Sequence, residues 1–206
     1  MSIEERYKHR YRSGDTPWDT GKPDFNLLEI VADHKIAGCK ALEVGCGNGD
    51  NAIWLAGNGF QTTASDVSGV AIERARQKAD ETGAECHFIE LDFLKNIIEG
   101  RPFGFIFDRG CFHSFGTDKE RSRFAQHVAL HLIPNGLWLS IIGNADERRQ
   151  GPGPPQRTAT EIVRAVEPFF EILLLVSSHF GSNRPNLPRA WRCLMQKREN
   201  ETTNYC

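Results

Sequence analysis

Long apolar runs, paired cysteines and an excess of charge are all missing from this sequence of 206 residues. Its longest strongly apolar run, Ile172 to Val176, is far shorter than the roughly 20 residues that a membrane-spanning helix requires. The formal net charge of -2 gives no general attraction to nucleic acid or to anionic membranes. We therefore expect a soluble protein that binds a small, roughly neutral molecule and neither nucleic acid nor a membrane.

The cysteines show no C-x-x-C spacing, and no cationic and then apolar leader precedes them. A chain of this length buries a full core without a metal or a disulfide to hold it together. This pattern predicts reduced thiols, no metal and a cytoplasmic location. The six cysteines are Cys39, Cys46, Cys86, Cys111, Cys193 and Cys206.

Short apolar segments of strand length alternate with segments of helical periodicity along most of the chain. Only a loop separates the last two expected strands, so the final strand should run antiparallel. We expect an α/β fold of Rossmann-like type, with a seven-stranded, mostly parallel sheet, one antiparallel strand at its end and helices on both faces. The expected strands cover residues 40–44, 61–66, 86–89, 103–108, 137–142, 170–176 and 191–196.

Two expected helices carry capping boxes, in which Thr117 precedes Glu120 and Thr158 precedes Glu161. Pro134 should end the first of these helices, and the second should end before residue 168. The buried stripe of the first should include Phe124, Val128 and Leu132. Earlier helices are expected over residues 25–36, 50–56 and 68–81.

The most informative segment is a glycine-rich loop between an expected strand and an expected helix. Glycine lets the backbone pass through left-handed and crowded conformations, so the main chain can press against a ligand. A dinucleotide-binding loop needs a third glycine where this chain has Asp50, whose charge would face the pyrophosphate. The loop and the acid before it are Glu43, Val44, Gly45, Cys46, Gly47, Asn48 and Gly49.

This E-x-G-x-G-x-G pattern suits a nucleoside that carries an amino acid, because Glu43 is placed to face an ammonium group. S-adenosylmethionine fits that description. The alternatives that the residues leave open are a tight strand-to-helix turn without a ligand and a nicotinamide dinucleotide site, which Asp50 disfavours.

Further acids follow the next two strands, and the carboxyl ends of neighbouring parallel strands meet at one crevice. Asp66, followed by Val67, is placed to accept hydrogen bonds from ribose hydroxyls. Asp92 is placed to accept a hydrogen bond from the adenine amino group, and Phe93 or Leu94 to pack on the ring. Each acid alone is equally consistent with a loop or helix cap, but together with the glycine loop they indicate one cofactor site.

The fourth expected strand runs into Asp108-Arg109-Gly110-Cys111-Phe112-His113, where the reactive methyl group of such a cofactor would point. Cys111 and His113 suit a nucleophile with its base, a pair of metal ligands, or ordinary wall residues. We take His113 and Asp108 as the catalytic candidates, in the role of a general base or of groups that orient the acceptor.

At this point the chain resembles the class I S-adenosylmethionine-dependent methyltransferases over about residues 27–197. Gly14-Asp15-Thr16-Pro17-Trp18-Asp19 and the segment 107–113 are similar to the branch of thiopurine, thiol, halide and tellurite-resistance methyltransferases. The resemblance implies a single domain with an amino-terminal segment, 1–24, over the cofactor, a core, 25–198, and a polar tail, 199–206. It places Trp18 near the methionine end of the cofactor, together with Tyr7 and Tyr11. The alternative for Trp18 is that it only anchors the amino-terminal segment by packing. The resemblance also adds Asp108 and Arg109 to the cofactor contacts.

The resemblance implies methyl transfer to a small molecule, at sulfur or another chalcogen, by in-line displacement. An O- or N-methyltransferase for small molecules and a non-catalytic protein that binds S-adenosylmethionine remain as alternatives. We expect a monomer or a homodimer. Five arginines near the late loops either attract an anionic acceptor or are solvated: Arg148, Arg149, Arg157, Arg184 and Arg189.

Overall fold

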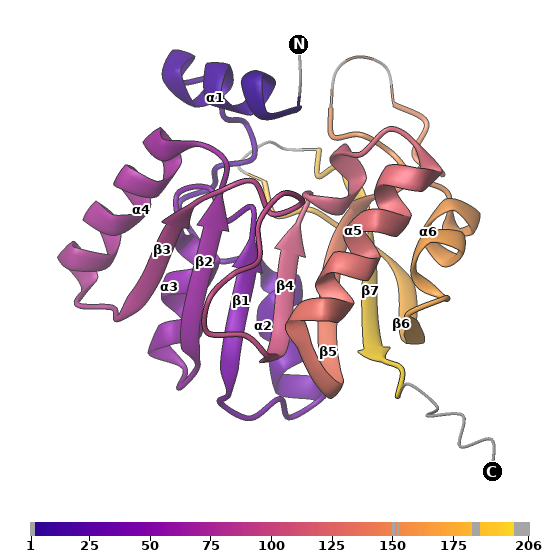
Figure 1. The fold of residues 1–206 in the computed structure, drawn as a ribbon. Coiled ribbons are helices and arrows are strands. Elements are labelled where there is room, and N and C mark those ends of the chain that lie inside the picture. The colour runs from indigo at the N-terminus through magenta and orange to yellow at the C-terminus, as the bar shows by residue number, and fades with distance from the viewer. Residues whose placement is uncertain (1–2, 150, 152, 183–185, 200–206) are drawn as a thin grey trace.

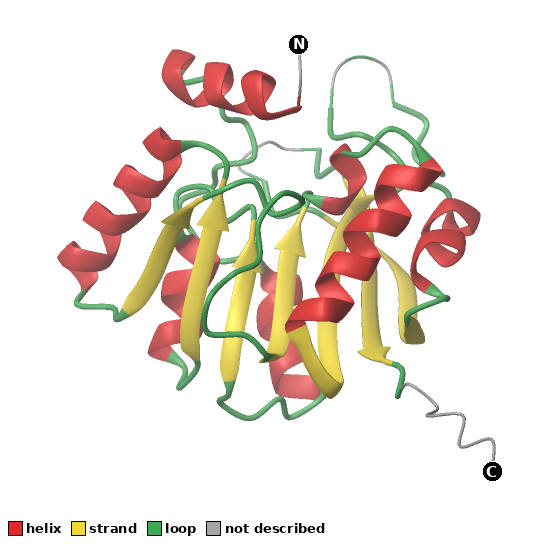
Figure 2. Cartoon of the chain, in the orientation of Figure 1, coloured by secondary structure: helices red, strands yellow, loops and turns green. Residues whose placement is uncertain are grey.

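The computed structural model describes residues 3–149, 151, 153–182 and 186–199. A twisted sheet forms its centre, with helices on both faces (Figures 1 and 2). The strands are β1 (Lys40–Val44), β2 (Gln61–Asp66), β3 (Cys86–Glu90), β4 (Phe103–Arg109), β5 (Leu132–Gly143), β6 (Phe170–His179) and β7 (Arg189–Lys197). The helices are α1 (Ile3–Ser13), α2 (Phe25–Asp33), α3 (Asp50–Gly57), α4 (Gly69–Thr82), α5 (Asp118–His131) and α6 (Ala159–Val166), with a short 3₁₀ helix, η1 (Phe112–Ser114).

The seven strands lie in the order β3-β2-β1-β4-β5-β7-β6, and β7 pairs antiparallel with both of its neighbours. The α/β, mostly parallel fold predicted from the sequence is confirmed. The antiparallel strand, however, lies inside the sheet between β5 and β6 and not at its end. The local pattern identified the hairpin but did not determine which of its strands pairs with β5.

Apolar side chains fill both faces of the sheet. On one face, Phe124 of α5 and Ile162 of α6 pack against Trp138 of β5. On the other face, Leu27 of α2 and Leu55 of α3 belong to a second buried cluster. Figure 1 shows α5 and α6 in front of the sheet and α2 and α3 behind it. This double cover explains why most of β4 and residues 137–142 of β5 are apolar in nearly continuous runs.

Both predicted capping boxes form, at Thr117 with Glu120 and at Thr158 with Glu161. One boundary differs from the prediction. Helix α5 ends at His131, and Leu132 already begins β5, which continues through Pro134. Pro134 therefore lies within an extended strand and does not itself end the helix.

The amino-terminal segment contains a helix, α1, that the sequence did not predict. Acids lie in its first turn and arginines in its last, which favours the helix dipole. The hydroxyl of Tyr7 lies 2.8 Å from Oγ of Ser114, and Arg74 donates to the carbonyl of Tyr11. Figure 1 shows α1 above the carboxyl ends of the first strands. This helix therefore covers the edge of the sheet at which the predicted site residues lie.

Candidate functional site

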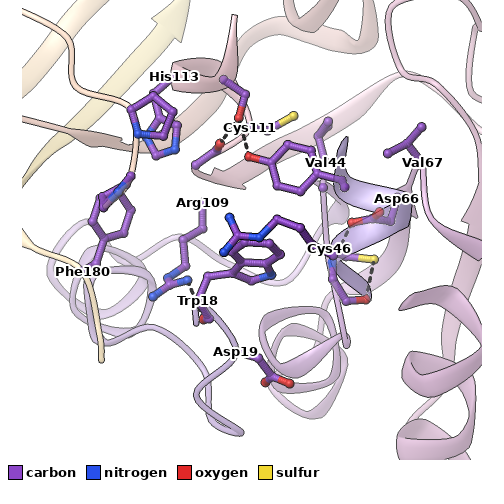
Figure 3. Close-up of a pocket in the computed structure, with 18 of the residues that line it drawn as sticks. Trp18, Asp19, Val44, Cys46, Asp66, Val67, Arg109, Cys111, His113 and Phe180 are labelled. Carbon is purple, nitrogen blue, oxygen red and sulfur yellow. Dashed lines mark hydrogen bonds between the residues drawn. The ribbon is translucent and has the colours of Figure 1, made fainter. Parts of the chain in front are cut away.

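A cavity of about 1260 Å³ opens at the carboxyl ends of the strands, beneath α1. Sites for a single small molecule usually enclose roughly 300–1,000 Å³, so this cavity has room for two ligands. Figure 3 shows Asp66, Val67 and Cys46 on one side and His113 and Phe180 on the other, with Trp18, Arg109 and Cys111 between them.

The glycine loop forms the floor of the cavity at its first two glycines. Gly45 and Gly47 have φ of 72° and 55°, in the left-handed region that favours glycine. A Cβ at Gly47 would lie 2.6 Å from the hydroxyl oxygen of Tyr11. Cys46 and Asn48 line the cavity beside them. Gly49 lies outside it, at the start of α3, where it packs against Ala75 and Phe88.

Glu43 is a buried carboxyl group at the end of β1, with 1% of its surface exposed. Its Oε1 accepts a hydrogen bond of 2.8 Å from the amide of Asn51. Its Oε2 is buried without a hydrogen-bond partner among the described residues. Burial is the main cause that raises the pKa of Glu43 to about 8. This acid faces the cavity and suits a cationic group that would pair with the free oxygen.

Asp66 ends β2 and joins this strand to the glycine loop. One carboxylate oxygen accepts from the amide of Gly47 and the other from the amide of Ser68, each at 2.9 Å. Burial raises the pKa of Asp66 above its usual value. Each oxygen keeps a lone pair for a further donor, and Val67 lines the cavity beside it.

Asp92 and Phe93 line the cavity just beyond β3. The carboxylate of Asp92 accepts from the amide of Leu94 at 3.0 Å and pairs with Lys95 at 2.8 Å. The ring of Phe93 meets that of Phe124 edge to face, with centroids 5.4 Å apart. Asp92 thus stands at the rim, while Phe93 connects the cavity wall to the apolar core.

Asp108 does not lie on the cavity, although the sequence suggested it as a catalytic and cofactor residue. Its carboxylate is fully buried. One oxygen accepts from the amides of Cys111 and Phe112 at 3.0 Å, and the other accepts from the indole of Trp138 at 2.9 Å. Burial raises its pKa to about 6. These bonds make Asp108 the anchor of the turn after β4, because its acceptor sites point into the protein.

His113 lies on the cavity wall with 4% of its surface exposed. The backbone N–H of Gly143 donates to its Nδ1 at 2.9 Å. A backbone amide can only donate, so Nδ1 carries no proton and the proton of the neutral ring is on Nε2. Burial, followed by nearby arginines, lowers the pKa of His113 to about 3. The imidazole can therefore donate a hydrogen bond into the site but is a very weak base.

The two cavity cysteines are protonated thiols. Burial raises the pKa of Cys46 and of Cys111 well above the ordinary value, so neither has the thiolate character of a nucleophile. No group of three or more potential ligands among the described residues is arranged to hold a metal ion. Cys111 instead packs close to Gly45; Cys206 lies outside the described residues.

Trp18 is the centre of an aromatic group formed by the amino-terminal segment. Its indole N–H donates to the hydroxyl of Tyr11 at 3.0 Å, and the ring of Tyr7 meets it at a centroid distance of 5.4 Å. The guanidinium of Arg10 lies 4.4 Å from the Trp18 ring centroid. Asp19, the next residue, accepts a hydrogen bond from the side chain of Asn48. The segment thus contacts the glycine loop directly.

The guanidinium of Arg109 is already bonded through all three of its nitrogens. Nε donates to Asp24 at 2.6 Å, Nη1 donates to the carbonyl of Trp18 at 3.1 Å, and Nη2 donates to the carbonyl of Gly181 at 2.6 Å. It also lies over the ring of Phe180, 5.3 Å from the centroid. Arg109 lines the cavity, but its polar groups serve the surrounding protein.

The arginines of the late loops have different roles. Arg157 donates to the carbonyls of His113 and Phe115 at 2.7 Å, and Arg149 pairs with Glu147 at 2.8 Å. Arg189 donates to the carbonyl of Asp146. Arg148 is exposed on the cavity rim and has no hydrogen bond to another described residue. Arg184 lies outside the described residues.

Comparison with known proteins identifies the family. Residues 41–136 match the model of a methyltransferase domain. A probable thiol methyltransferase of Arabidopsis thaliana is 27% identical over 178 residues, which cover 85% of this chain and 77% of the relative. These matches support a class I S-adenosylmethionine-dependent methyltransferase.

Solved structures of other proteins have the same fold as this methyltransferase. One is the structure described as "Conversion of a Disulfide Bond into a Thioacetal Group during Echinomycin Biosynthesis". It superposes with a TM-score of 0.82 at 24% identity, and the match covers 98% of this chain and 94% of that chain. A second is the 1,6-didemethyltoxoflavin-N1-methyltransferase of Burkholderia thailandensis with bound S-adenosylhomocysteine, with a TM-score of 0.74 at 17% identity over 96% of this chain and 88% of that one. Together with the match to the methyltransferase domain, these structures support S-adenosylmethionine as the cofactor.

Several cavity residues of the methyltransferase were not found from the sequence. Asn51 lines the cavity without a motif around it, and Phe180 lies in a loop far along the chain. Asp24, which likewise has no motif around it, does not line the cavity but binds Arg109, which does. Tyr7 and Tyr11 are spaced four residues apart, which places them on one face of a helix, and that spacing was the available signal for α1. In the described part of the chain, no helix is sufficiently long and apolar to span a membrane.

Proposed function

We propose that this methyltransferase transfers the methyl group of S-adenosylmethionine to a sulfur or other chalcogen atom of a small molecule, by in-line displacement. The observation that carries this proposal is the state of His113. Its Nδ1 accepts the N–H of Gly143 and its pKa is lowered to about 3, so the histidine on the cavity wall is a hydrogen-bond donor and not a base. A nucleophile that reaches this wall must therefore attack without giving a proton to His113, as an anion does.

The acidity of the acceptor then decides between sulfur and oxygen as the attacking atom. A cysteine-type thiol has an ordinary pKa near 8.5 and a phenol near 10, so far more thiolate than phenolate is present at neutral pH. Alcohols require a general base. Asp108, the other candidate base, is turned away from the cavity by its three donors. This supports a soft, acidic acceptor such as a thiol.

Residues of this chain fit the cofactor in turn. The unpaired oxygen of Glu43 suits the ammonium group of the methionine part, and Asp66 keeps lone pairs for the ribose hydroxyls. Asp92 at the rim suits the adenine amino group, with Phe93 beneath the ring. Trp18 covers the methionine end from above. When bound, S-adenosylmethionine supplies a methyl group on a sulfonium, a reactive electrophile.

The protein's task in the reaction is to hold the acceptor in line and to exclude water. The N–H at Nε2 of His113 orients an anionic acceptor without taking a proton from it. The ring of Phe180 packs edge to face against His113, with centroids 5.7 Å apart, and closes that side of the cavity. Correct placement alone can lower a barrier by as much as roughly 7–11 kcal/mol, which is sufficient for a displacement that needs no proton transfer.

The test compares acceptors that differ in the attacking atom alone. Purified protein is incubated with methyl-labelled S-adenosylmethionine and either 4-nitrothiophenol or 4-nitrophenol, both of which are anionic in mildly alkaline buffer. Selenide, iodide and an aromatic amine complete the panel. Preferential methylation of sulfur or selenium supports the proposal. Faster transfer to the phenol or amine identifies an O- or N-methyltransferase, and binding of cofactor without transfer to any class would overturn the proposal in favour of a non-catalytic binder.

A further inference from the structure

Arg109 joins three segments that are far apart in the sequence. It ends β4, and its guanidinium reaches Trp18 and Asp24 of the amino-terminal segment and Gly181 of the loop after β6. Its ion pair with Asp24 is largely buried, with side-chain exposures of 12% and 1%. Figure 3 shows Arg109 between Trp18 and Phe180. A charged group in this setting fixes the positions of its partners, because each lost bond would leave a buried polar atom unpaired.

The two outer segments are also bonded to each other. Asn26, in α2 directly after the amino-terminal segment, donates through its side chain to the carbonyl of His179 at 2.9 Å and accepts from the hydroxyl of Ser178 at 2.5 Å, both at the end of β6. The amide of Gly181 donates to the same oxygen of Asp24 that Arg109 binds. The segment over the cofactor and the wall that carries Phe180 therefore form one connected unit with Arg109 at its centre.

This unit continues to the cofactor floor. The amide N–H of Asp24 donates to the side chain of Asn51 at 2.8 Å, and the amide of Asn51 donates to Glu43 at 2.8 Å. An unbroken series of hydrogen bonds thus runs from the acid proposed for the cofactor ammonium to the wall proposed for the acceptor. Such a contiguous network provides a physical route for coupling between two sites.

We propose that Arg109 is a positioning residue that couples the two halves of the cavity, so that cofactor binding fixes the amino-terminal segment and the Phe180 wall together. Arg109 acts through Trp18, Asp24 and Gly181 and does not itself hold either ligand. The effect on the acceptor rests on the proposed function. The effect on the cofactor rests on the family assignment alone.

The experiment measures affinity for S-adenosylhomocysteine by calorimetry in Arg109→Gln, Arg109→Lys, Asp24→Asn and the double variant Asp24→Asn/Arg109→Gln. Arg164→Gln, an exposed residue on α6 outside the cavity, is the matched control. We expect Arg109→Gln to weaken binding between about 5-fold and 150-fold, the range typical of coupled sites. The double variant should bind about as weakly as Arg109→Gln alone, because the pair acts as a unit.

A second readout follows the amino-terminal segment itself. Trypsin cleavage after Arg10 and Arg12 should be slowed by S-adenosylhomocysteine in the unmodified protein and in Arg164→Gln, and hardly slowed in Arg109→Gln. Arg109→Lys should recover part of the protection, since a lysine ammonium can still pair with Asp24. Should Arg109→Gln fail to fold, the same comparison is made with Arg109→Lys, whose affinity is then expected to fall at least about 5-fold.

Affinity and protection that stay within about twofold of the unmodified protein in every Arg109 variant, or additive losses in the double variant, would overturn the proposal. With any acceptor that the panel identifies, Arg109→Gln should raise the acceptor KM more than it lowers kcat. If the panel finds no acceptor, the proposed function fails while the calorimetry and proteolysis still decide the role of Arg109.

Discussion

The backbone N–H of Gly143 donates to Nδ1 of His113 at 2.9 Å and thereby determines which nitrogen of the ring bears the proton. Gly143 ends β5, and His113 lies in η1 just after β4, so the bond joins two neighbouring strand ends. The ring is held with its Nε2–H available to the cavity. One backbone amide thus turns a potential base into a hydrogen-bond donor. The site then favours acceptors that do not need a base to remove a proton.

His113→Asn should separate this donor role from folding. The asparagine oxygen can still accept from Gly143, so stability should change little. The shorter side chain no longer places an N–H where Nε2 of the histidine lies, so kcat/KM for the acceptor should fall by about 10- to 100-fold. This is the loss expected for about 1.5–3 kcal/mol of hydrogen bonding to a charged group. Affinity for S-adenosylhomocysteine should not change. The pH profile of kcat/KM should keep its shape, since no histidine loses a proton during the reaction.

His113→Phe is the companion variant. It removes the acceptor of a buried amide N–H and should lower the free energy of unfolding by about 1–3 kcal/mol. Denaturant titration measures this loss. If the unmodified enzyme shows an acidic limb near pH 6–7 that disappears in His113→Asn, the imidazole acts as a base and the donor assignment is wrong.

Asp108→Asn tests the structural role of the buried carboxylate. An amide placed in the same position offers one acceptor oxygen where the carboxylate has two, so either the amides after β4 or the indole of Trp138 loses its partner. We expect a loss of about 1–3 kcal/mol in the free energy of unfolding. The matched control is Asp80→Asn, on the exposed surface of α4, which should be within about 0.5 kcal/mol of the unmodified protein.

Catalytic rate distinguishes the two roles of Asp108 further. A structural anchor predicts that kcat follows the folded fraction and recovers at lower temperature. A base predicts a variant that is as stable as the unmodified protein but inactive. Denaturant titration and initial rates on the same preparations decide between them.

Most of the fold was predictable from the sequence because its elements carry local signals. The glycine loop, the capping boxes at Thr117 and Thr158 and the apolar strands each depend on residues close together in the chain. Helix α1 was missed because its residues are strongly polar, and contacts of Tyr7 and Tyr11 with distant parts of the fold hold it in place. The place of β7 in the sheet is likewise set by tertiary pairing, which no local pattern encodes.

The candidate site was predictable to a similar extent and for a similar reason. Strand ends gave the positions of Glu43 and Asp66, and both line the cavity. Asp108 and Arg109 are adjacent on β4, and successive side chains of a strand point to opposite faces. Their position at a strand end therefore did not determine whether Asp108 or Arg109 points toward the cavity. The structure places Arg109 on the cavity and directs Asp108 into the core.

Glu43 should make cofactor binding depend on pH. Its pKa of about 8 in the free protein means that the carboxyl group is largely protonated at neutral pH. Pairing with the ammonium of S-adenosylhomocysteine favours the ionised form and lowers this pKa, so binding releases a proton. Affinity should therefore rise as the pH increases toward about 8, by up to about tenfold per pH unit, because each unit of pKa corresponds to about 1.4 kcal/mol.

Calorimetry in buffers of different ionisation enthalpy measures the released proton directly. Glu43→Gln should bind more weakly and without this pH dependence. The folded-state pKa lies above the ordinary value of 4.5, so the contribution of Glu43 to stability is fully present below about pH 4.5 and is lost as the pH rises through about 8. Unliganded Glu43→Gln should accordingly resist alkaline unfolding better than the unmodified protein, and the opposite order would contradict this account.

Gly47→Ala tests whether the amino-terminal segment can approach the glycine loop closely only because Gly47 has no side chain. The residue has φ of 55°, and a Cβ would lie 2.6 Å from the hydroxyl oxygen of Tyr11. We expect a loss of about 1–2 kcal/mol from the left-handed backbone and at least about tenfold weaker binding of S-adenosylhomocysteine as Tyr11 is displaced. Gly57→Ala, in α3 with open space around it, should instead gain up to about 1 kcal/mol.

The double variant Gly47→Ala/Tyr11→Phe separates the clash from the backbone strain. Removing the hydroxyl takes away the atom that the new Cβ would meet, so affinity should recover in part even though Tyr11→Phe alone loses the bond from the Trp18 indole. The strain at φ of 55° remains in both backgrounds, so stability should not recover to the same extent. Losses that simply add would mean that Tyr11 and the glycine loop act independently, and that the helix over the cofactor is positioned by its other contacts alone.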